Sequence, residues 1–446
     1  MKWIHPIHFK MKNFVSKKFL RPVCFIFGLA LILLNIALLK ADVSPDENTF
    51  YDSNPAHLWN RLNKTLFIRI DREGKKYGLD ELDILYWFRT KNLLVEPSHQ
   101  QALTILDEFN DTHGEKLIRD PRKRALLQRD LWSLFDWVAT PFGNVNESGA
   151  RRELQSRLAI AIRRVALSTN EIALLPDNYA ESKTLPDLPQ GLFKTNGAWV
   201  NVGIGYSEAA AMAHVANSSG RSTFLVMLRH PGGRPAAIDY LKQLSSFTPM
   251  WVYRTNSDST IEPQPNPALP QFPRNTQWAL VRRMNVIDTE GRIQPTRIVE
   301  SIQMRTYQDF FRQHGEDPSL PENPKRAQRF QEFQMSRTSN PTLNEIEKGE
   351  KSFRQFFSKG FDPFEHQSKG GPSEFQMEPL RSCIECHSDS GIHSVNTFSR
   401  RFSGGSSVYT PQIIASNPKQ ESAVTINWKQ TQFNWGLLQG LWRHGE

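Results

Sequence analysis

Cysteine is scarce in this chain, which has only Cys24, Cys383 and Cys386 among its 446 residues. Disulfides are therefore not a general source of stability, and a chain of this length can bury enough apolar surface without them. The sequence also lacks G-x-S-x-G, P-loop and H-E-x-x-H motifs, so it carries no signature of the catalytic or nucleotide-binding sites that these motifs build. It has no internal repeat and no long low-complexity block.

Net charge is nearly absent once the first residues are set aside. The whole chain carries +9, but residues 1–41 hold seven Lys or Arg and no acid, which leaves 48 basic and 46 acidic residues, a net charge of +2, in the remainder. A nucleic-acid partner usually requires a strongly basic surface. We therefore expect no nucleic-acid partner.

An uncharged apolar run, VCFIFGLALILLNIALL, occupies residues 23–39 and follows several lysines. A basic start, an apolar run and a small residue such as Ala41 are typical of a secretory signal peptide. Leu39 stands where a small residue is preferred, and the run is close to the roughly 20 apolar residues of a spanning helix. Residues 1–41 are thus predicted to be a signal peptide or an N-terminal membrane anchor. Either way, the rest of the chain is expected in the periplasm, secreted or tethered to the inner membrane, and Cys24 is interpreted as filler.

Beyond residue 41 we predict an α+β protein built from consecutive regions. Residues 42–55 are polar and are expected to form a tether. Residues 56–185 are expected to be mainly helical, and residues 190–340 to form an antiparallel β-rich region with a packed helix. Residues 341–446 are expected to form a small region that ends in a C-terminal helix.

Apolar residues at helical spacing are the evidence for the first region. Residues 122–140 (RKRALLQRDLWSLFDWVAT) and 151–168 (RRELQSRLAIAIRRVALS) each carry one apolar stripe, and Pro121 suits a first helical turn. Residues 66–80 (LFIRIDREGKKYGLD) look like a short hairpin around Glu73 and Gly74.

Short runs rich in β-branched and apolar residues, separated by turn signals, are the evidence for the second region. The runs 278–288 and 296–308 are joined by a short loop, which favours an antiparallel sheet. PAAIDYLKQLSSF (235–247) is predicted to be a helix that packs on this sheet, and AVTINWKQTQFNWGLLQGLWRH (423–444) a single helix with an aromatic stripe. The strands are predicted at 198–203, 222–230, 278–288, 296–308 and 329–337.

The two remaining cysteines stand in RSCIECHSDSGIHS, residues 381–394, with His387 directly behind them. In an exported chain, C-x-x-C-H is typical of covalent haem attachment. Two thiols three positions apart in a helical turn point to one side, where both can form thioether bonds to one porphyrin. The next residue, His387, is then placed under the ring to bind the iron. We therefore predict one covalent haem c on Cys383 and Cys386, with His387 as the proximal metal ligand.

Other chemistries use the same two thiols. A disulfide between Cys383 and Cys386, a thiol redox pair, and half of a zinc site are the alternatives. A thioredoxin-like pair should follow a strand and open a helix, which this Gly- and Ser-rich context does not resemble. A zinc site needs two further ligands close by, and no second C-x-x-C is present.

Cys383, Cys386 and His387 resemble the haem-attachment motif of c-type cytochromes, over 10 to 20 of the 446 residues. That resemblance implies the same roles for these residues, two thioether cysteines and a proximal ligand. More loosely, LLQRDLWSLFDWVA, LLPDNYA and LRSCIECHSDSGIHSV are similar to tracts in large exported bacterial proteins of unassigned function with one haem motif. The likeness implies no activity.

The sequence does not identify the distal ligand of the haem. In the commonest small cytochromes a methionine follows the motif by several tens of residues, whereas no methionine follows residue 377 here. A Met/His pair would raise the reduction potential, while an open site would admit small gases or peroxide. The candidates are His393, His366, His444, Met377, Met335, or no protein ligand at all.

These features together predict an exported monohaem c-type cytochrome-like protein that acts in electron transfer or redox sensing, with an unknown redox partner. Residues 341–446 would then be its haem c-binding region. Two alternatives stay open. One is a non-haem interaction or scaffold protein with a local Cys383–Cys386 disulfide, and the other is a haem enzyme with an open distal site. Whether the protein is an enzyme is therefore undecided.

Two weaker patterns have plain interpretations. Asp130 and Asp136 lie six positions apart, hence on different helical faces, and are expected to be solvated or salt-bridged rather than a pair for acid–base catalysis. His230 and Arg234 flank a Gly-Gly turn that resembles an anion-binding corner. We expect it to be an ordinary turn that requires glycine.

Overall fold

The chain divides into two compact units, residues 1–47 and 48–446. The computed structural model describes only residues of the second unit. Among these residues, no helix combines the length and the apolar character that crossing a membrane requires. The described residues are 49–70, 74, 76–79, 86, 90–140, 147–204, 211–246, 251–266, 268–308, 328–337, 342–345, 364–365, 391–395, 411–413 and 418–444.

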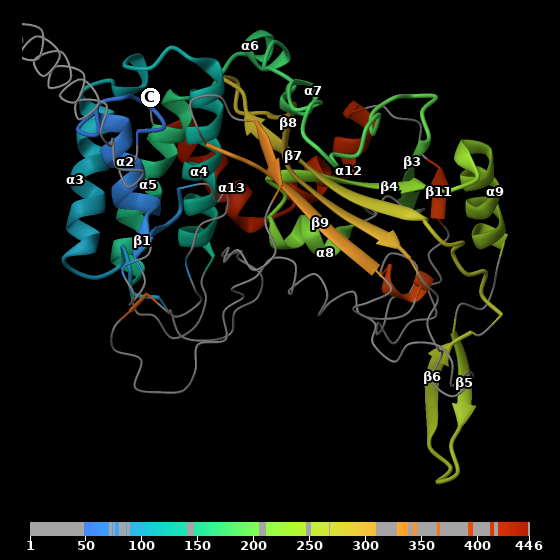
Figure 1. The fold of residues 1–446 in the computed structure, drawn as a ribbon. Coiled ribbons are helices and arrows are strands. Elements are labelled where there is room, and N and C mark those ends of the chain that lie inside the picture. The colour runs from blue at the N-terminus through green and yellow to red at the C-terminus, as the bar shows by residue number, and fades with distance from the viewer. Residues whose placement is uncertain are drawn as a thin grey trace, which may run out of the picture. The chain divides into compact units, whose positions relative to one another are not determined.

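The protein has an α+β fold in which a group of helices packs beside an antiparallel sheet (Figure 1). A short antiparallel hairpin, β1 (Arg69–Ile70) with β2 (Lys76–Tyr77), confirms the hairpin expected around Gly74. The helical elements before the sheet are α2 (Leu58–Phe67), α3 (Ser98–Asp111), η1 (Gly114–Lys116), α4 (Pro121–Ala139), α5 (Ser148–Arg164), α6 (Thr169–Ala173) and α7 (Asn178–Glu181).

Helix α4 lies at the centre of the fold. Asp120 caps its N-terminus by accepting hydrogen bonds from the backbone N–H groups of Arg122 and Lys123, and Pro121 occupies the first turn as expected. Every residue from Ala125 to Ala139 is buried, because α4 packs against α5 and α13 on one side and against the sheet on the other.

The main sheet has seven strands in the order β10-β9-β8-β7-β4-β3-β11, and all neighbours are antiparallel. The β-rich region and its packed helix are thereby confirmed. Helix α9 (Gly233–Ser246) contacts β3, β4 and β11. The strands are β3 (Trp199–Ile204), β4 (Ser222–Arg229), β7 (Gln277–Ile287), β8 (Ile293–Tyr307), β9 (Gln328–Met335), β10 (Leu343–Glu345) and β11 (Pro411–Ile413).

Both faces of this sheet are buried, in two separate apolar clusters. Side chains of alternate strand residues point to opposite faces: in β4, Leu225 and Met227 belong to one cluster, whereas Phe224 and Val226 belong to the other. The first cluster, which includes Ala125 and Leu126 of α4, is called the helix-side face below. The second, which includes Tyr240 and Leu241 of α9, is called the α9-side face.

Two amides join the helical elements to the sheet. The Gln128 amide donates to the Ile287 carbonyl at 2.8 Å and accepts from the Ile287 N–H at 2.8 Å. Asn178 forms the same two-point contact with the backbone of Val299, at 2.9 and 2.8 Å. Each contact satisfies a donor and an acceptor of a buried strand, which is what a covered sheet requires.

The C-terminal part is helical, but the single helix predicted for residues 423–444 is wrong. The chain forms α12 (Pro418–Gln430) and α13 (Phe433–His444), with a break at Thr431 and Gln432. Trp428 packs against the α9-side face, whereas Trp435 and Trp442 enter the core of the helical group. The expected aromatic stripe is therefore divided between two cores.

Other elements had no counterpart in the predictions. These are β10, β11, helix α8 (Met212–Asn217), and a separate two-stranded hairpin, β5 (Trp251–Thr255) with β6 (Ile261–Pro265). In Figure 1 this hairpin extends away from the seven-stranded sheet.

Candidate functional site

Cys383, Cys386 and His387, the predicted haem-binding residues, lie outside the described residues, as do His366 and Met377. The structure does describe the chain on both sides of this segment. Phe364 and Glu365 precede it, and Gly391 to Val395 follow it. The way in which these two flanks are held is therefore the structural information that bears on the site.

The flank that follows the motif is a buried 3-10 turn, η2 (Gly391–Ser394). The side chains of Ile392 and Val395 belong to the α9-side face, where both are almost fully buried. The Ile392 N–H donates to Gln271 Oε1 at 2.8 Å. The first residue of the turn, Gly391, lies four positions beyond His387.

Two side chains at the end of strand β8 hold the other end of the turn. The Arg305 guanidinium donates to the Ser394 carbonyl at 2.9 Å and to the Ser394 hydroxyl at 3.3 Å. The hydroxyls of Tyr307 and Ser394 share a hydrogen bond. Because the Ser394 hydroxyl itself donates to the Gly391 carbonyl at 2.7 Å, Tyr307 is the donor in that pair. Burial raises the pKa of Tyr307, so this donor keeps its proton at neutral pH.

Gly391 is required at the start of the turn. Its φ is +49°, a left-handed conformation that favours glycine. A β-carbon at this position would lie 2.0 Å from Gln271 Oε1, the acceptor of the Ile392 N–H. A side chain here would therefore strain the backbone and would displace the Gln271 amide from the Ile392 N–H.

Aromatic rings pack beneath this turn, on the α9-side face. The Phe272 ring lies 4.9 Å from Tyr307, 5.4 Å from Trp278 and 5.6 Å from Tyr240, measured between centroids. All four rings are buried. Such a group is rigid and largely dry, because large aromatic side chains fill the space between strands and α9.

The flank that precedes the motif is held by the helical part of the chain. Glu365 Oε1 accepts from Thr90 Oγ1 at 2.8 Å and from the Asn92 N–H at 3.1 Å. Phe364 is buried, and the Arg69 guanidinium stacks on its ring at 4.6 Å. The residues before the motif are therefore held by the helical part of the chain, and the residues after it are held by the sheet.

The structure separates the candidates for the distal ligand. Met335 lies buried on the helix-side face of the sheet, the face opposite to the one that holds Ile392 and Val395. It is core filler, as expected. His393 lies in η2 and His444 ends α13, but their side chains are outside the described part of the chain.

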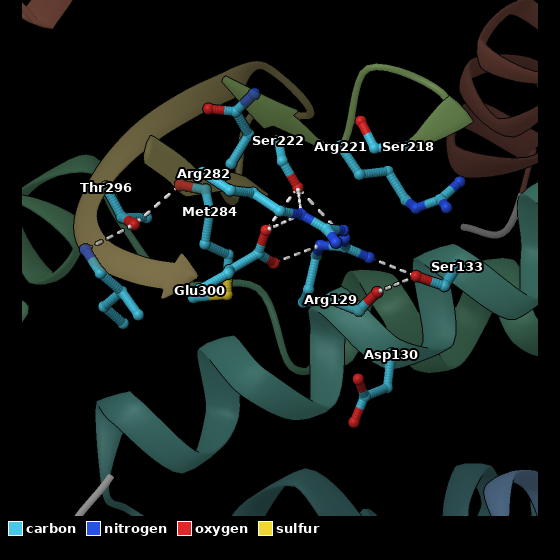
Figure 2. Close-up of polar contacts among 12 residues, drawn as sticks. Arg129, Asp130, Ser133, Ser218, Arg221, Ser222, Arg282, Met284, Thr296 and Glu300 are labelled. Carbon is cyan, nitrogen blue, oxygen red and sulfur yellow. Dashed lines mark hydrogen bonds and ion pairs between the residues drawn. The ribbon is translucent and has the colours of Figure 1, made fainter. Parts of the chain in front are cut away.

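A second cluster of polar residues lies where α4 meets the sheet. Figure 2 shows Arg129 of α4 and Arg282 of β7 converging on Glu300 of β8. The Glu300 carboxylate forms ion pairs with both guanidinium groups, with Arg129 Nε 2.9 Å from Oε1 and Arg282 Nε 2.7 Å from Oε2. Ser222 bonds all three of these side chains. Glu300 and Arg129 have no exposed surface.

The two aspartates of α4 extend this cluster in different directions, as their spacing predicts. Asp130 forms a two-point ion pair with Arg337, one contact being 2.6 Å. Asp136 pairs with Arg221 and Lys429. Both aspartates are buried, so the salt-bridged interpretation is confirmed and the solvated one is wrong.

Burial sets the titration of these groups. It raises the pKa of Asp130, although Arg337 acts in the opposite direction. It lowers the pKa of Lys429 to about 8, against the attraction of Asp136. Since each charge is paired and out of solvent, the cluster cannot meet a substrate, and its evident role is to fix α4 and α12 against the sheet.

Residues His230 and Arg234 are also occupied structurally. Arg234 Nη1 donates to the carbonyls of Gly197 and Trp199, at 3.2 and 2.7 Å, and His230 Nδ1 accepts from the Gly232 N–H at 3.0 Å. The turn interpretation is therefore confirmed. Across the described ranges, no group of three or more His, Cys, Asp or Glu side chains is placed to hold a metal ion.

Sequence reasoning missed the residues that hold the turn, namely Gln271, Arg305 and Tyr307. No local signal marks them, because they meet residues 391–394 only through the fold. The buried ion pairs left a visible signal: Arg282 and Glu300 interrupt the apolar runs of central strands, where an unpaired charge would be costly. Comparisons with known families, with characterised proteins and with solved structures find no match to this chain.

Proposed function

We propose that this chain is an exported monohaem c-type cytochrome-like protein. Its covalent haem would be attached to Cys383 and Cys386, with His387 as the proximal iron ligand, and it would serve electron transfer or redox sensing. The observation that carries the proposal furthest is the fixed turn Gly391–Ser394, which starts four residues after His387.

Chain length limits how far the proximal ligand lies from this turn. Four residues of fully extended chain span at most about 14 Å. His387 is therefore within that distance of Gly391, whose neighbour Ile392 is held by Gln271. A ligand that must keep one orientation beneath a porphyrin benefits from attachment to such a rigid element.

The surroundings of the turn also fit a haem protein. The rings of Phe272, Tyr240 and Trp278 form an apolar, water-poor wall near the turn. An apolar shell around a metal site controls solvent access and hence the reduction potential. When bound, the haem would supply iron that gains and loses one electron.

The proposal is tested by making the protein in a host that attaches haem c. We expect the wild-type chain to keep haem colour after denaturation and electrophoresis, because thioether bonds survive unfolding. The double variant Cys383→Ala/Cys386→Ala should lose it. Cys24→Ala, the matched control in the predicted signal segment, should keep it.

A colourless wild-type chain with free thiols, or with a Cys383–Cys386 disulfide, would overturn the proposal and favour the scaffold alternative. For a coloured chain, the spectrum of the reduced protein with and without carbon monoxide separates the remaining roles. An unchanged spectrum indicates a six-coordinate electron carrier, and a carbon monoxide adduct indicates an open distal face.

A further inference from the structure

The hairpin formed by β5 and β6 has two unequal edges. The Asn256 N–H donates to the Thr260 carbonyl at 2.8 Å, so these two residues face each other across the ladder. In an antiparallel pair, the backbone groups of successive residues point alternately toward the partner strand and away from it. The N–H and C=O groups of residues 251, 253 and 255 on β5, and of 261, 263 and 265 on β6, therefore point outward.

Prolines occupy two of the three outward positions on β6. Pro263 pairs with Tyr253 and Pro265 pairs with Trp251. Proline has no N–H, so these two positions offer no donor to a further strand. The outer edge of β6 is thus blocked in the way that natural sheets protect exposed edges.

The outer edge of β5 carries no such block. Trp251, Tyr253 and Thr255 each keep an outward N–H and C=O, and among the described strands only β6 pairs with β5. The same face of the hairpin holds two large exposed side chains, Tyr253 at 77% and Ile261 at 66% exposure. An isolated two-stranded hairpin is marginally stable in water, so a further strand would stabilise it.

We propose that the open edge of β5 pairs with β5 of a second copy of this chain, antiparallel about Tyr253. In this arrangement Tyr253 lies opposite the same residue of the other copy, and Trp251 lies opposite its Thr255. By symmetry, Thr255 lies opposite Trp251 of the other copy. Each of these three pairs places outward N–H and C=O groups face to face and forms two hydrogen bonds, which gives six backbone hydrogen bonds in total.

A second copy of this chain suits the open edge of β5 better than a strand of another protein does. The pairing is symmetric, so one surface serves both chains, and it creates a tyrosine–tyrosine contact across strands. The product is a four-stranded ribbon whose outer edges are both β6, each blocked by Pro263 and Pro265. Association therefore stops at the dimer instead of continuing into a fibre.

The proposed contact is small. A five-residue strand pair is well below the roughly 1,200 Å² at the low end of stable interfaces. We therefore expect a dimer that dissociates on dilution. The proposal is independent of the haem, because it uses only the hairpin backbone.

Analytical ultracentrifugation of the protein over about 1 to 100 µM tests the proposal. The wild-type chain should shift from monomer to dimer as its concentration rises. Tyr253→Pro removes the central outward N–H without touching the bonds to β6, and it should stay monomeric. Tyr253→Thr keeps the N–H and is the matched control, which should still dimerise.

The blocked edge gives the complementary test. Pro263→Val/Pro265→Val restores two outward donors on β6, and this variant should form species larger than the dimer. A wild-type chain that stays monomeric throughout would overturn the proposal and leave the edge to a strand of a different protein. Equal dimerisation of Tyr253→Pro and wild type would also overturn it, because the contact would then lie elsewhere.

Discussion

The Lys429 ammonium lies 2.8 Å from each carboxylate oxygen of Asp136, where α12 meets α4. Arg221 pairs with the same carboxylate, Arg129 lies in the same cluster, and the Trp132 ring lies 5.3 Å from the ammonium. Two buried cations thus share one anion. Burial lowers the Lys429 pKa to about 8.

This arrangement predicts an unusual pH dependence of stability. The folded pKa of Lys429 is below its ordinary value of 10.5, so between these values the unfolded chain binds more protons than the folded chain. The free energy of unfolding should therefore rise with pH above 8, by up to about 1.4 kcal/mol per pH unit. Below pH 8 the group is protonated in both states and contributes no slope.

Denaturant unfolding from about pH 7 to pH 10 measures this slope. Lys429→Met should abolish it, while Asp136 keeps its contact with Arg221. Lys242→Met, which removes an exposed lysine of α9, should leave the slope unchanged. Buried tyrosines such as Tyr51, whose pKa is raised by burial, act in the opposite direction above about pH 10, so the test is confined to lower pH.

Glu300 should be far more costly to replace than an exposed glutamate. Glu300→Gln leaves Arg129 and Arg282 buried without an anion, and we expect a loss of about 3–5 kcal/mol in the free energy of unfolding. Glu108→Gln breaks the Arg61 pair at the surface and should cost about 1 kcal/mol or less. Equal losses in the two variants would contradict the importance assigned to the buried cluster.

Gly391 and Gly436 should respond to alanine with opposite signs. Gly391→Ala places a β-carbon against Gln271 at a left-handed backbone position, and should cost about 1–3 kcal/mol. Gly436 lies in α13 with open space around it, so Gly436→Ala should stabilise by about 0.5–1 kcal/mol. Thermal unfolding of both variants checks the pair, and a stable Gly391→Ala chain would show that the turn is not held as described.

Tyr307 should affect the haem as well as stability. Tyr307→Phe removes the hydrogen bond to Ser394, and Tyr179→Phe removes a comparable buried bond to the Pro189 carbonyl on the helix-side face. Each should cost about 1 kcal/mol. If the haem lies near the turn, only Tyr307→Phe should shift its midpoint potential. Equal potentials in both variants would place the haem away from this turn.

Much of the fold was visible in the sequence because its central elements have regular apolar patterns. Strands β4, β7 and β8 appeared as runs rich in β-branched and apolar residues, since both faces of the sheet are covered. The break after α12 was not visible. No glycine or proline marks Thr431 or Gln432, and Trp428 and Trp435, on either side of the break, pack into different cores.

The β5–β6 hairpin and the turn Gly391–Ser394 show two other features that a local sequence pattern does not predict. Proline is not typical of a strand interior, yet Pro263 and Pro265 of β6 both stand where the ladder needs no donor. The motif C-x-x-C-H indicated a chemistry, but the residues that hold the following turn come from a loop and a strand far away in sequence. Such contacts follow from the fold and have no local pattern.

The intact mass of the protein, made in a host that attaches haem c, is the sharpest test of haem attachment at Cys383 and Cys386. We expect a polypeptide heavier by one haem, with the added mass located in the peptide that contains Cys383 and Cys386. A mass equal to that of the bare polypeptide, with both sulfurs free or bonded to each other, would contradict it.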